Sequence, residues 1–142
     1  MAGTMELKLR PLLSSYLFVY GTLMRGGKSP YARLLQARAI FTGTASVEGR
    51  LYNLGGFPGL VHVPGCGRAV HGEVYRLGAG GLLDNLDAYE GCRESDPEPG
   101  LFRRERIEAR LANGSPLTVW TYLYTGETAG RPQIASGRFP LR

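Results

Sequence analysis

Hydrophobic and polar residues alternate with two different periods along this chain. Short apolar or alternating runs that stop at glycine or proline are typical of β-strands. The clearest are a nearly all-apolar run at residues 16–20 and an alternating run at residues 69–77. A longer β-prone stretch covers residues 39–53, with breaks expected at Gly43 and Gly49. The pattern therefore predicts several strands, of which the first is buried.

Two segments show helix signals instead. Ser29 followed by Pro30 is an N-cap with proline at the first helical position, which predicts a short helix to about residue 36. The spacing of leucines predicts a second helix over residues 82–90, ended by Gly91.

A hairpin is the strongest turn signal. Strands are predicted over residues 102–112 and 117–124, joined by the Asn-Gly-Ser-Pro turn at residues 113–116. Residues 55–59 are predicted to form a loop, and the polar residues 92–100 a surface loop that can serve as a lid. Strands dominate without alternating regularly with helices, which predicts an α+β domain with a curved or closed sheet.

Length and composition fit one globular domain. The chain has 142 residues, of which 43% are hydrophobic and 20% charged, as in ordinary soluble proteins. Residues 1–15 show no clear period and are expected to form a loosely ordered leader, and residues 16–142 a single domain. No apolar run approaches the roughly 18 residues of a membrane span, and no cleavage site follows the N-terminal run. We expect a cytoplasmic protein without a membrane partner.

The formal net charge is +5, carried almost wholly by arginine. Nucleic acid or a small anionic substrate would both suit this charge. The only dense group, residues 103–106, is of mixed sign and is typical of a solvated strand face. The charge does not favour a nucleic-acid partner, and we expect none.

Cysteine and histidine show no metal-binding spacing. Cys66 and Cys92 are predicted to be free thiols, and His62 and His71 are isolated. The glycines of residues 78–81 do not complete a dinucleotide fingerprint, because leucine fills its third glycine position. We expect no metal and no cofactor.

Glu90 is unusual for its position on the predicted helix. At 100° per residue it falls between Leu86 and Leu83, inside the apolar stripe. Burial and the negative end of the helix dipole both favour the neutral carboxyl, so its pKa is expected to rise towards the range useful for acid/base catalysis. The alternatives are that Glu90 pairs with a buried arginine or reaches water at a frayed helix end.

Tyr20, Gly21, Thr22 and Leu23 follow the first strand directly. A strand end with free backbone N–H groups can bind a carboxylate or carbonyl, and Gly21 would let a ligand approach closely. A simple turn is the alternative.

Together, the YGTL segment, a later GGFPG segment, LDAYEG at the helix end and a following Phe-Arg-Arg resemble the γ-glutamylcyclotransferase-like family over about residues 16–139. The resemblance implies a small mixed β-barrel flanked by short helices. It also implies a cyclotransferase, formally an acyltransferase, that releases 5-oxoproline from a small γ-glutamyl amine or amino acid without a cofactor. Glu90 would be the catalytic acid/base and Tyr20, Gly21, Thr22 and Leu23 the substrate cradle, in a monomer or weak homodimer.

Two departures from the family pattern concern the pocket. Phe102 stands where relatives often have tyrosine, and Arg138 and Phe139 stand where the pattern usually closes with Asp-Trp. These changes can alter the pocket rim and the leaving amine that it accepts. Two other functions stay open, namely a non-catalytic protein of the same fold that binds a γ-glutamyl metabolite and a nucleic-acid-binding barrel.

Overall fold

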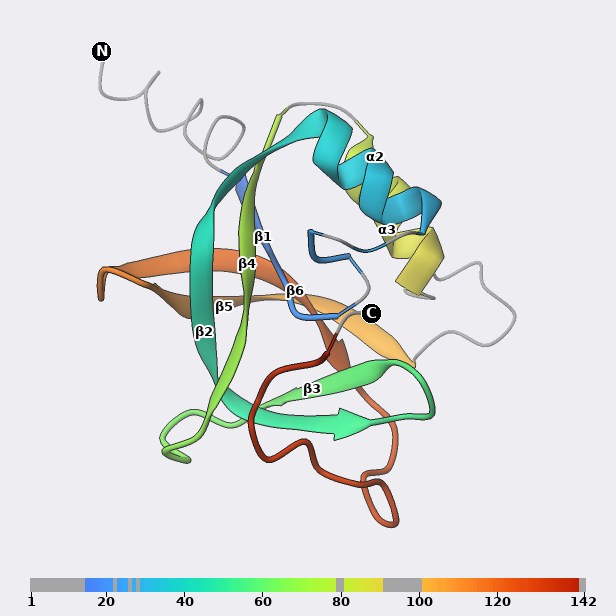
Figure 1. Ribbon diagram of the computed structural model, residues 1–142, viewed down its shortest axis with the longest axis vertical. Helices are drawn as coiled ribbons and strands as arrows, with labels where there is room; N and C mark the ends of the chain where they lie inside the picture. Colours follow the sequence, from blue (N-terminus) through green and yellow to red (C-terminus); the bar gives the residue numbers. More distant parts are fainter. Residues whose placement is uncertain are drawn as a thin grey trace.

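Six strands and two helices form the described part of the chain (Figure 1). The computed structural model describes residues 15–21, 23–25, 27, 29–78, 81–90 and 101–140, with the backbone alone for residues 88–90. The strands are β1 (Ser15–Val19), β2 (Ala39–Asn53), β3 (Pro58–His62), β4 (Ala69–Leu77), β5 (Phe102–Leu111) and β6 (Pro116–Tyr124), and the helices are α2 (Pro30–Arg38) and α3 (Leu82–Glu90). The predicted leader lies outside the described residues except for Ser15, the first residue of β1.

The sheet closes on itself. Its strand order is β3-β2-β4-β1-β6-β5, and an additional pairing of β2 with β5 makes a five-stranded barrel with β3 attached to β2. The sheet is mixed because β1 and β6 are parallel, whereas the other pairs are antiparallel. Helices α2 and α3 lie together on one side of the barrel (Figure 1). The predicted small mixed β-barrel flanked by short helices is confirmed.

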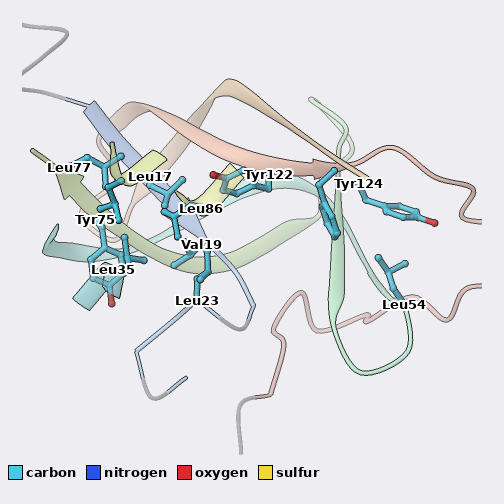
Figure 2. Packing of buried hydrophobic residues seen from close by; sticks show 12 residues of the cluster. Leu17, Val19, Leu23, Leu35, Leu54, Tyr75, Leu77, Leu86, Tyr122 and Tyr124 are labelled. Carbon is cyan, nitrogen blue, oxygen red and sulfur yellow. The ribbon is translucent and has the colours of Figure 1, made fainter. Parts of the chain in front are cut away.

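Strand β1 is apolar at Leu17, Phe18 and Val19 because both of its faces are buried there. Leu17 and Val19 point into a cluster that includes Leu35 of α2 and Leu86 of α3 (Figure 2). Phe18, between them in sequence, points to the other face and joins a second cluster. A strand covered on both faces has no solvent-facing position for polar residues, which explains the continuous apolar run.

Several local predictions are confirmed. Strand β4 and helix α3 have the predicted bounds. Helix α2 begins at Pro30, and the side chain of Ser29 accepts a hydrogen bond from the backbone N–H of Ala32 at 3.0 Å. In the β5–β6 hairpin, Gly114 has a φ of 90°, which glycine adopts without steric cost.

The predicted breaks in residues 39–53 are wrong. Strand β2 runs unbroken through Gly43, where a bulge shifts its register to β4, and through Gly49. A Cβ atom at Gly49 would overlap the carbonyl oxygen of Val61 on β3, so glycine here permits close strand pairing and does not end the strand. The predicted loop is also too long, because Pro58 already belongs to β3.

The segment after β6 lies along the barrel. The backbone N–H of Ile134 donates to the carbonyl of Leu51 on β2 at 2.7 Å. The N–H of His71 on β4 donates to the carbonyl of Gly137 at 2.8 Å. These contacts hold residues 138 and 139 beside β4. Within the described part of the chain, no helix has the length and apolarity needed to cross a membrane.

Candidate functional site

Glu90 is the last residue of α3, and its side chain lies outside the described residues. The helix face predicted to be apolar is confirmed at Leu82 and Leu86, which are 4% and 0% exposed. Asp87 precedes Glu90 by three residues, about one helical turn, so both positions lie on neighbouring parts of one face. The contacts of Asp87 therefore fix the orientation of the helix end that carries Glu90.

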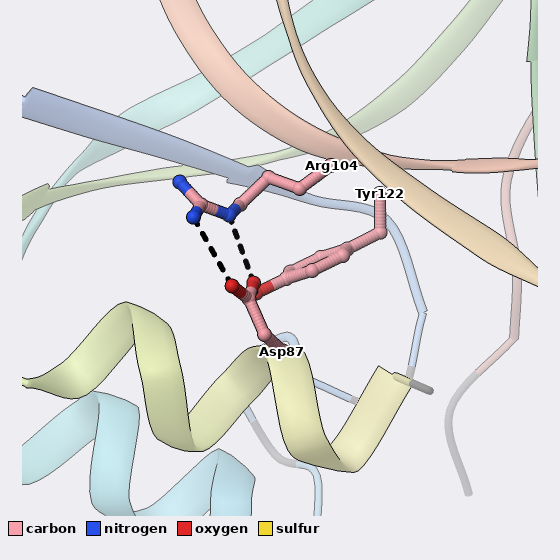
Figure 3. Close-up of polar contacts among 3 residues, drawn as sticks. All are labelled: Asp87, Arg104 and Tyr122. Atoms are coloured by element: carbon pink, nitrogen blue, oxygen red, sulfur yellow. Dashed lines mark hydrogen bonds and ion pairs between the residues drawn. The ribbon is translucent and has the colours of Figure 1, made fainter. Parts of the chain in front are cut away.

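Asp87 accepts three hydrogen bonds from the barrel (Figure 3). Arg104 donates from Nε to Oδ1 at 2.8 Å and from Nη2 to Oδ2 at 3.1 Å. The hydroxyl of Tyr122 donates to Oδ1 at 2.7 Å. The paired contact of a guanidinium with a carboxylate is strong and directional. We name these three residues the Asp87 network.

The Asp87 network is partly shielded from water. The side chains of Arg104 and Asp87 are 23% and 15% exposed, and the Arg104 guanidinium stacks 4.5 Å from the ring centre of Trp120. The residues on either side of Arg104 are more exposed to water. Arg103 and Glu105 form an ion pair in which their side chains are 68% and 38% exposed. The prediction of a solvated face thus holds for Arg103 and Glu105 and is wrong for Arg104.

The two-residue period of a strand was a sequence signal for the partial burial of Arg104. Side chains two apart on a strand share a face, so Arg104 lies on the side of the buried Phe102. The partner could not be read from the sequence, because α3 and β5 meet only in the folded barrel.

The hydroxyl of Tyr20 makes structural contacts inside the barrel. It donates to the carbonyl oxygen of Tyr122 at 2.6 Å and accepts from the N–H of Leu60 at 3.3 Å. Tyr20 is 6% exposed, so any contact with a ligand would come from its backbone. Tyr122 thereby links the two predicted parts of the site, with its carbonyl bound to Tyr20 and its hydroxyl bound to Asp87.

The rest of the predicted cradle is tightly packed where it is described. A Cβ atom at Gly21 would lie 2.7 Å from Cγ of Pro58, so no other residue fits there without a shift. Leu23 is 3% exposed and packs in the cluster under the helices. Thr22 lies outside the described residues.

Glu73 of β4 holds the segment that follows the cradle. Its Oε1 accepts the backbone N–H of Arg25 at 2.6 Å, and its Oε2 lies 3.5 Å from Nε of the same arginine. The Arg25 guanidinium also lies 3.9 Å from the ring centre of Phe41 on β2. The N–H of Met24 donates to the carbonyl of Gly21 at 3.0 Å, which makes the segment a turn. The barrel therefore fixes the exit of the cradle segment.

Tyr75 lies two residues beyond Glu73 on the same face of β4. It is 1% exposed, and its hydroxyl has no hydrogen-bond partner among the residues that the structure describes. Burial, followed by the charge of Glu73, raises the pKa of Tyr75 to about 12. The hydroxyl is thus kept neutral beside the cradle segment.

The two departures from the family pattern lie in different places. Phe102 is buried, with its ring 6.0 Å from that of Tyr124 and 6.4 Å from that of Phe57. Arg138 is exposed, whereas Phe139 packs against the second cluster, to which Phe18 belongs. Phe102 therefore belongs to the packed core, and residues 138 and 139 lie in the C-terminal segment near His71.

Metal-binding groups do not gather in the part of the chain that the structure covers, where no three His, Cys, Asp or Glu side chains could share an ion. Cys66 is a free thiol, as predicted. Cys92 and the predicted lid lie outside the described residues.

Comparison with known proteins gives the family. Residues 17–141 match the family model for "Gamma-glutamyl cyclotransferase, AIG2-like". The chain is 31% identical over 125 residues to gamma-glutamylaminecyclotransferase A of Danio rerio, covering 83% of this chain and 73% of that protein. It is 36% identical over 107 residues to a putative gamma-glutamylcyclotransferase of Vibrio cholerae, covering 75% and 79%.

A solved structure agrees with these sequence matches. The AIG2-like protein of Mus musculus superimposes with a TM-score of 0.68 at 26% identity, covering 91% of this chain and 97% of that one. Fold, sequence and family model thus agree over nearly the whole chain, which belongs to the AIG2-like gamma-glutamyl cyclotransferase family and is a γ-glutamylcyclotransferase-like enzyme.

Proposed function

We propose that the protein releases 5-oxoproline from a γ-glutamyl amine or a γ-glutamyl amino acid, with Glu90 as general acid/base. Residues Tyr20, Gly21, Thr22 and Leu23 hold the γ-glutamyl group through their backbone. The names of the relatives, which include gamma-glutamylaminecyclotransferase, support this substrate class.

The proposed reaction is an intramolecular acyl transfer. The α-amine of the substrate attacks the γ-amide carbonyl, the C–N bond to the leaving amine breaks, and a five-membered lactam forms. Because the nucleophile is tethered to the carbonyl, ring closure needs orientation more than activation. Glu90 takes a proton from the α-ammonium group and returns one to the leaving amine. Backbone N–H groups of the cradle stabilise the α-carboxylate or the developing oxyanion.

One observation carries this proposal, namely the link through Tyr122. Its carbonyl binds Tyr20 at the start of the cradle, and its hydroxyl binds Asp87 one turn before Glu90. A general acid/base must be held at a fixed distance from the group that binds the substrate. Tyr122 and Arg104 supply that connection from the barrel to the helix.

A product assay tests the proposal. The protein is incubated with γ-glutamyl amino acids, a γ-glutamyl-lysine isopeptide and glutathione, and 5-oxoproline is quantified. We expect product from at least one substrate and a loss of about 10²-fold or more in kcat for Glu90→Gln. Glu108→Gln, which changes an exposed glutamate on β5, is the matched control and should leave kcat unchanged.

Binding measurements separate the competing outcomes. Absence of product across the panel contradicts the enzymatic proposal, and tight calorimetric binding without product would support a γ-glutamyl-metabolite-binding protein instead. Full activity of a folded Glu90→Gln variant would move the catalytic role to another residue. The cytoplasmic location and the monomeric or weakly dimeric state stay predictions from the sequence.

A further inference from the structure

A hollow of about 650 Å³ opens on the outer face of strands β2 and β4. Along that face of β4, Leu77 and Tyr75 pack under the helices, Glu73 binds the segment after the cradle, and His71 follows in the hollow. Met24, in the same segment, forms part of the wall. The hollow therefore lies next to the predicted cradle, on the side away from the helices.

The walls of the hollow carry an excess of positive charge. Arg110 of β5 and Arg138 of the C-terminal segment are cationic, and Glu73 is the only acidic residue among the described residues of the lining. Glu73 is already neutralised by the backbone N–H and the guanidinium of Arg25. Neither Arg110 nor Arg138 is paired with a carboxylate among residues 15–78, 81–90 and 101–140, as far as these are described. Arg110 donates from Nη1 to the carbonyl of Gly114 at 2.8 Å, and both positive charges are without a counter-ion among the described residues.

Hydrogen-bonding groups lie beside these charges. The hydroxyls of Thr44 and Ser46 on β2 line the hollow, and neither donates to another described residue. His71 faces them from β4, where it is paired with Ser46. Burial, followed by the charge of Arg138, lowers the pKa of His71. His71 and Arg138 line the same hollow.

We propose that this hollow is a second binding site, which takes a small molecule bearing carboxylate or phosphate oxygens between Arg138, Arg110 and His71. A volume of this size suits a small metabolite. Two guanidinium groups, two hydroxyls and a ring N–H are donors that match anionic oxygens. Met24 and Phe139 provide apolar contact for the rest of the ligand. Because Met24 directly follows the cradle, an occupant would also stabilise the segment after the cradle.

The two histidines of the chain allow a direct test by NMR. The imidazole signals of His71 and His62 are followed while succinate, inorganic phosphate or ethylammonium is added to the intact protein. An anion beside His71 stabilises the imidazolium, so saturating succinate or phosphate should raise its midpoint pH. The charged groups that line the hollow with His71 are Arg138 and Arg110 from the neighbouring segments and Glu73 from its own strand. Strand β2 lines it with Thr44, Ala45 and Ser46, and Glu48, which pairs with Ala69, is outside the described lining. His62 lies outside the hollow and reports non-specific effects in the same spectrum.

The matched variants are Arg138→Gln and Arg33→Gln, of which the second removes the same charge from the exposed surface of α2. We expect Arg138→Gln to weaken binding of the anions by about tenfold, the value of one charge-assisted hydrogen bond. It should also raise the midpoint pH of the His71 titration in the absence of ligand. Arg33→Gln should change neither the affinity for the anions nor this midpoint. Stronger binding of succinate than of phosphate would identify carboxylates as the ligand class, and the reverse would identify phosphates.

The proposal is overturned if neither anion shifts His71 in a saturable way, or if Arg33→Gln weakens binding as much as Arg138→Gln. It is also overturned if ethylammonium gives the same shift as the anions. The titration is repeated in Glu90→Gln to distinguish binding at the hollow from turnover at the proposed catalytic site. Binding at the hollow should persist in this variant even though it forms no product.

Discussion

Arg104 and Asp87 join strand β5 to the last turns of helix α3 through two hydrogen bonds, at 2.8 and 3.1 Å. They are 17 residues apart in sequence and lie on different elements of the fold. Apart from the hydrogen bond of Asp87 with Tyr122, the described side chains of the helix pack through apolar contacts, which can slide, whereas a bidentate ion pair sets both distance and direction. The pair therefore fixes the rotation of α3 relative to the barrel.

Asp87→Asn tests this role. The change leaves Arg104, at 23% exposure, without its carboxylate, and we expect the free energy of unfolding to fall by about 1–3 kcal/mol. Glu105→Gln is the matched control, because it breaks an exposed ion pair on the same strand and should cost less than about 1 kcal/mol. Denaturant titration measures both.

Turnover distinguishes positioning from stability in the same variants. If the Asp87 network positions Glu90, Asp87→Asn lowers kcat more than it raises KM at a temperature where the variant is fully folded. An unchanged kcat would limit Asp87 to a stabilising role.

Tyr122→Phe removes one hydroxyl from the Asp87 network. We expect a loss of about 1 kcal/mol in unfolding free energy, because one hydrogen bond to a partly buried carboxylate is lost. Tyr124→Phe removes the same atom from the same strand, where the hydroxyl donates to the carbonyl of Glu127 at 3.0 Å. In double-mutant cycles with Asp87→Asn, Tyr122→Phe should be non-additive and Tyr124→Phe additive. Additivity in both cycles would refute coupling between Tyr122 and Asp87.

Tyr75→Phe is expected to stabilise the protein. Its buried hydroxyl has no partner among the described residues, so removal of the oxygen relieves a desolvation cost of about 1 kcal/mol. The pKa of Tyr75 is about 12 in the folded protein and about 10 when unfolded. Because the folded value is raised, ionisation of Tyr75 favours the unfolded state. The free energy of unfolding is therefore unaffected by this ionisation below about pH 10 and falls as pH rises from about 10 to 12. The unfolding free energy of the wild type should therefore fall more steeply with pH than that of Tyr75→Phe across this interval. Equal slopes of unfolding free energy against pH would contradict the raised pKa of Tyr75.

Gly72→Ala tests the approach of β1 to β4. A Cβ atom at Gly72 would overlap the carbonyl oxygen of Val19 and lie 2.8 Å from Cζ of Phe18. We expect a loss of about 1–3 kcal/mol from overpacking. Gly78→Ala, where nothing lies within 4 Å of the added carbon, should be neutral or slightly stabilising. Similar thermal midpoints for the two variants would show that β1 can move away from β4 without cost.

Elements whose signals are local could be predicted from the amino-acid sequence. Strand β4, helix α3 and the β5–β6 hairpin follow from alternation, leucine spacing and an Asn-Gly turn, each readable within about ten residues. Motif resemblance over about residues 16–139 then indicated the family and the barrel, which the fold and the comparisons confirm.

Which side chains contact one another depends on the folded barrel. Glycine usually breaks strands, yet β2 continues through Gly43 and Gly49 because a bulge and close packing against β3 need a residue without a side chain. Arg104 belongs to a charged run in sequence, but barrel closure turns it towards Asp87 and its neighbours towards water. Such contacts join distant segments, and their energies depend on burial and direction that no local pattern encodes.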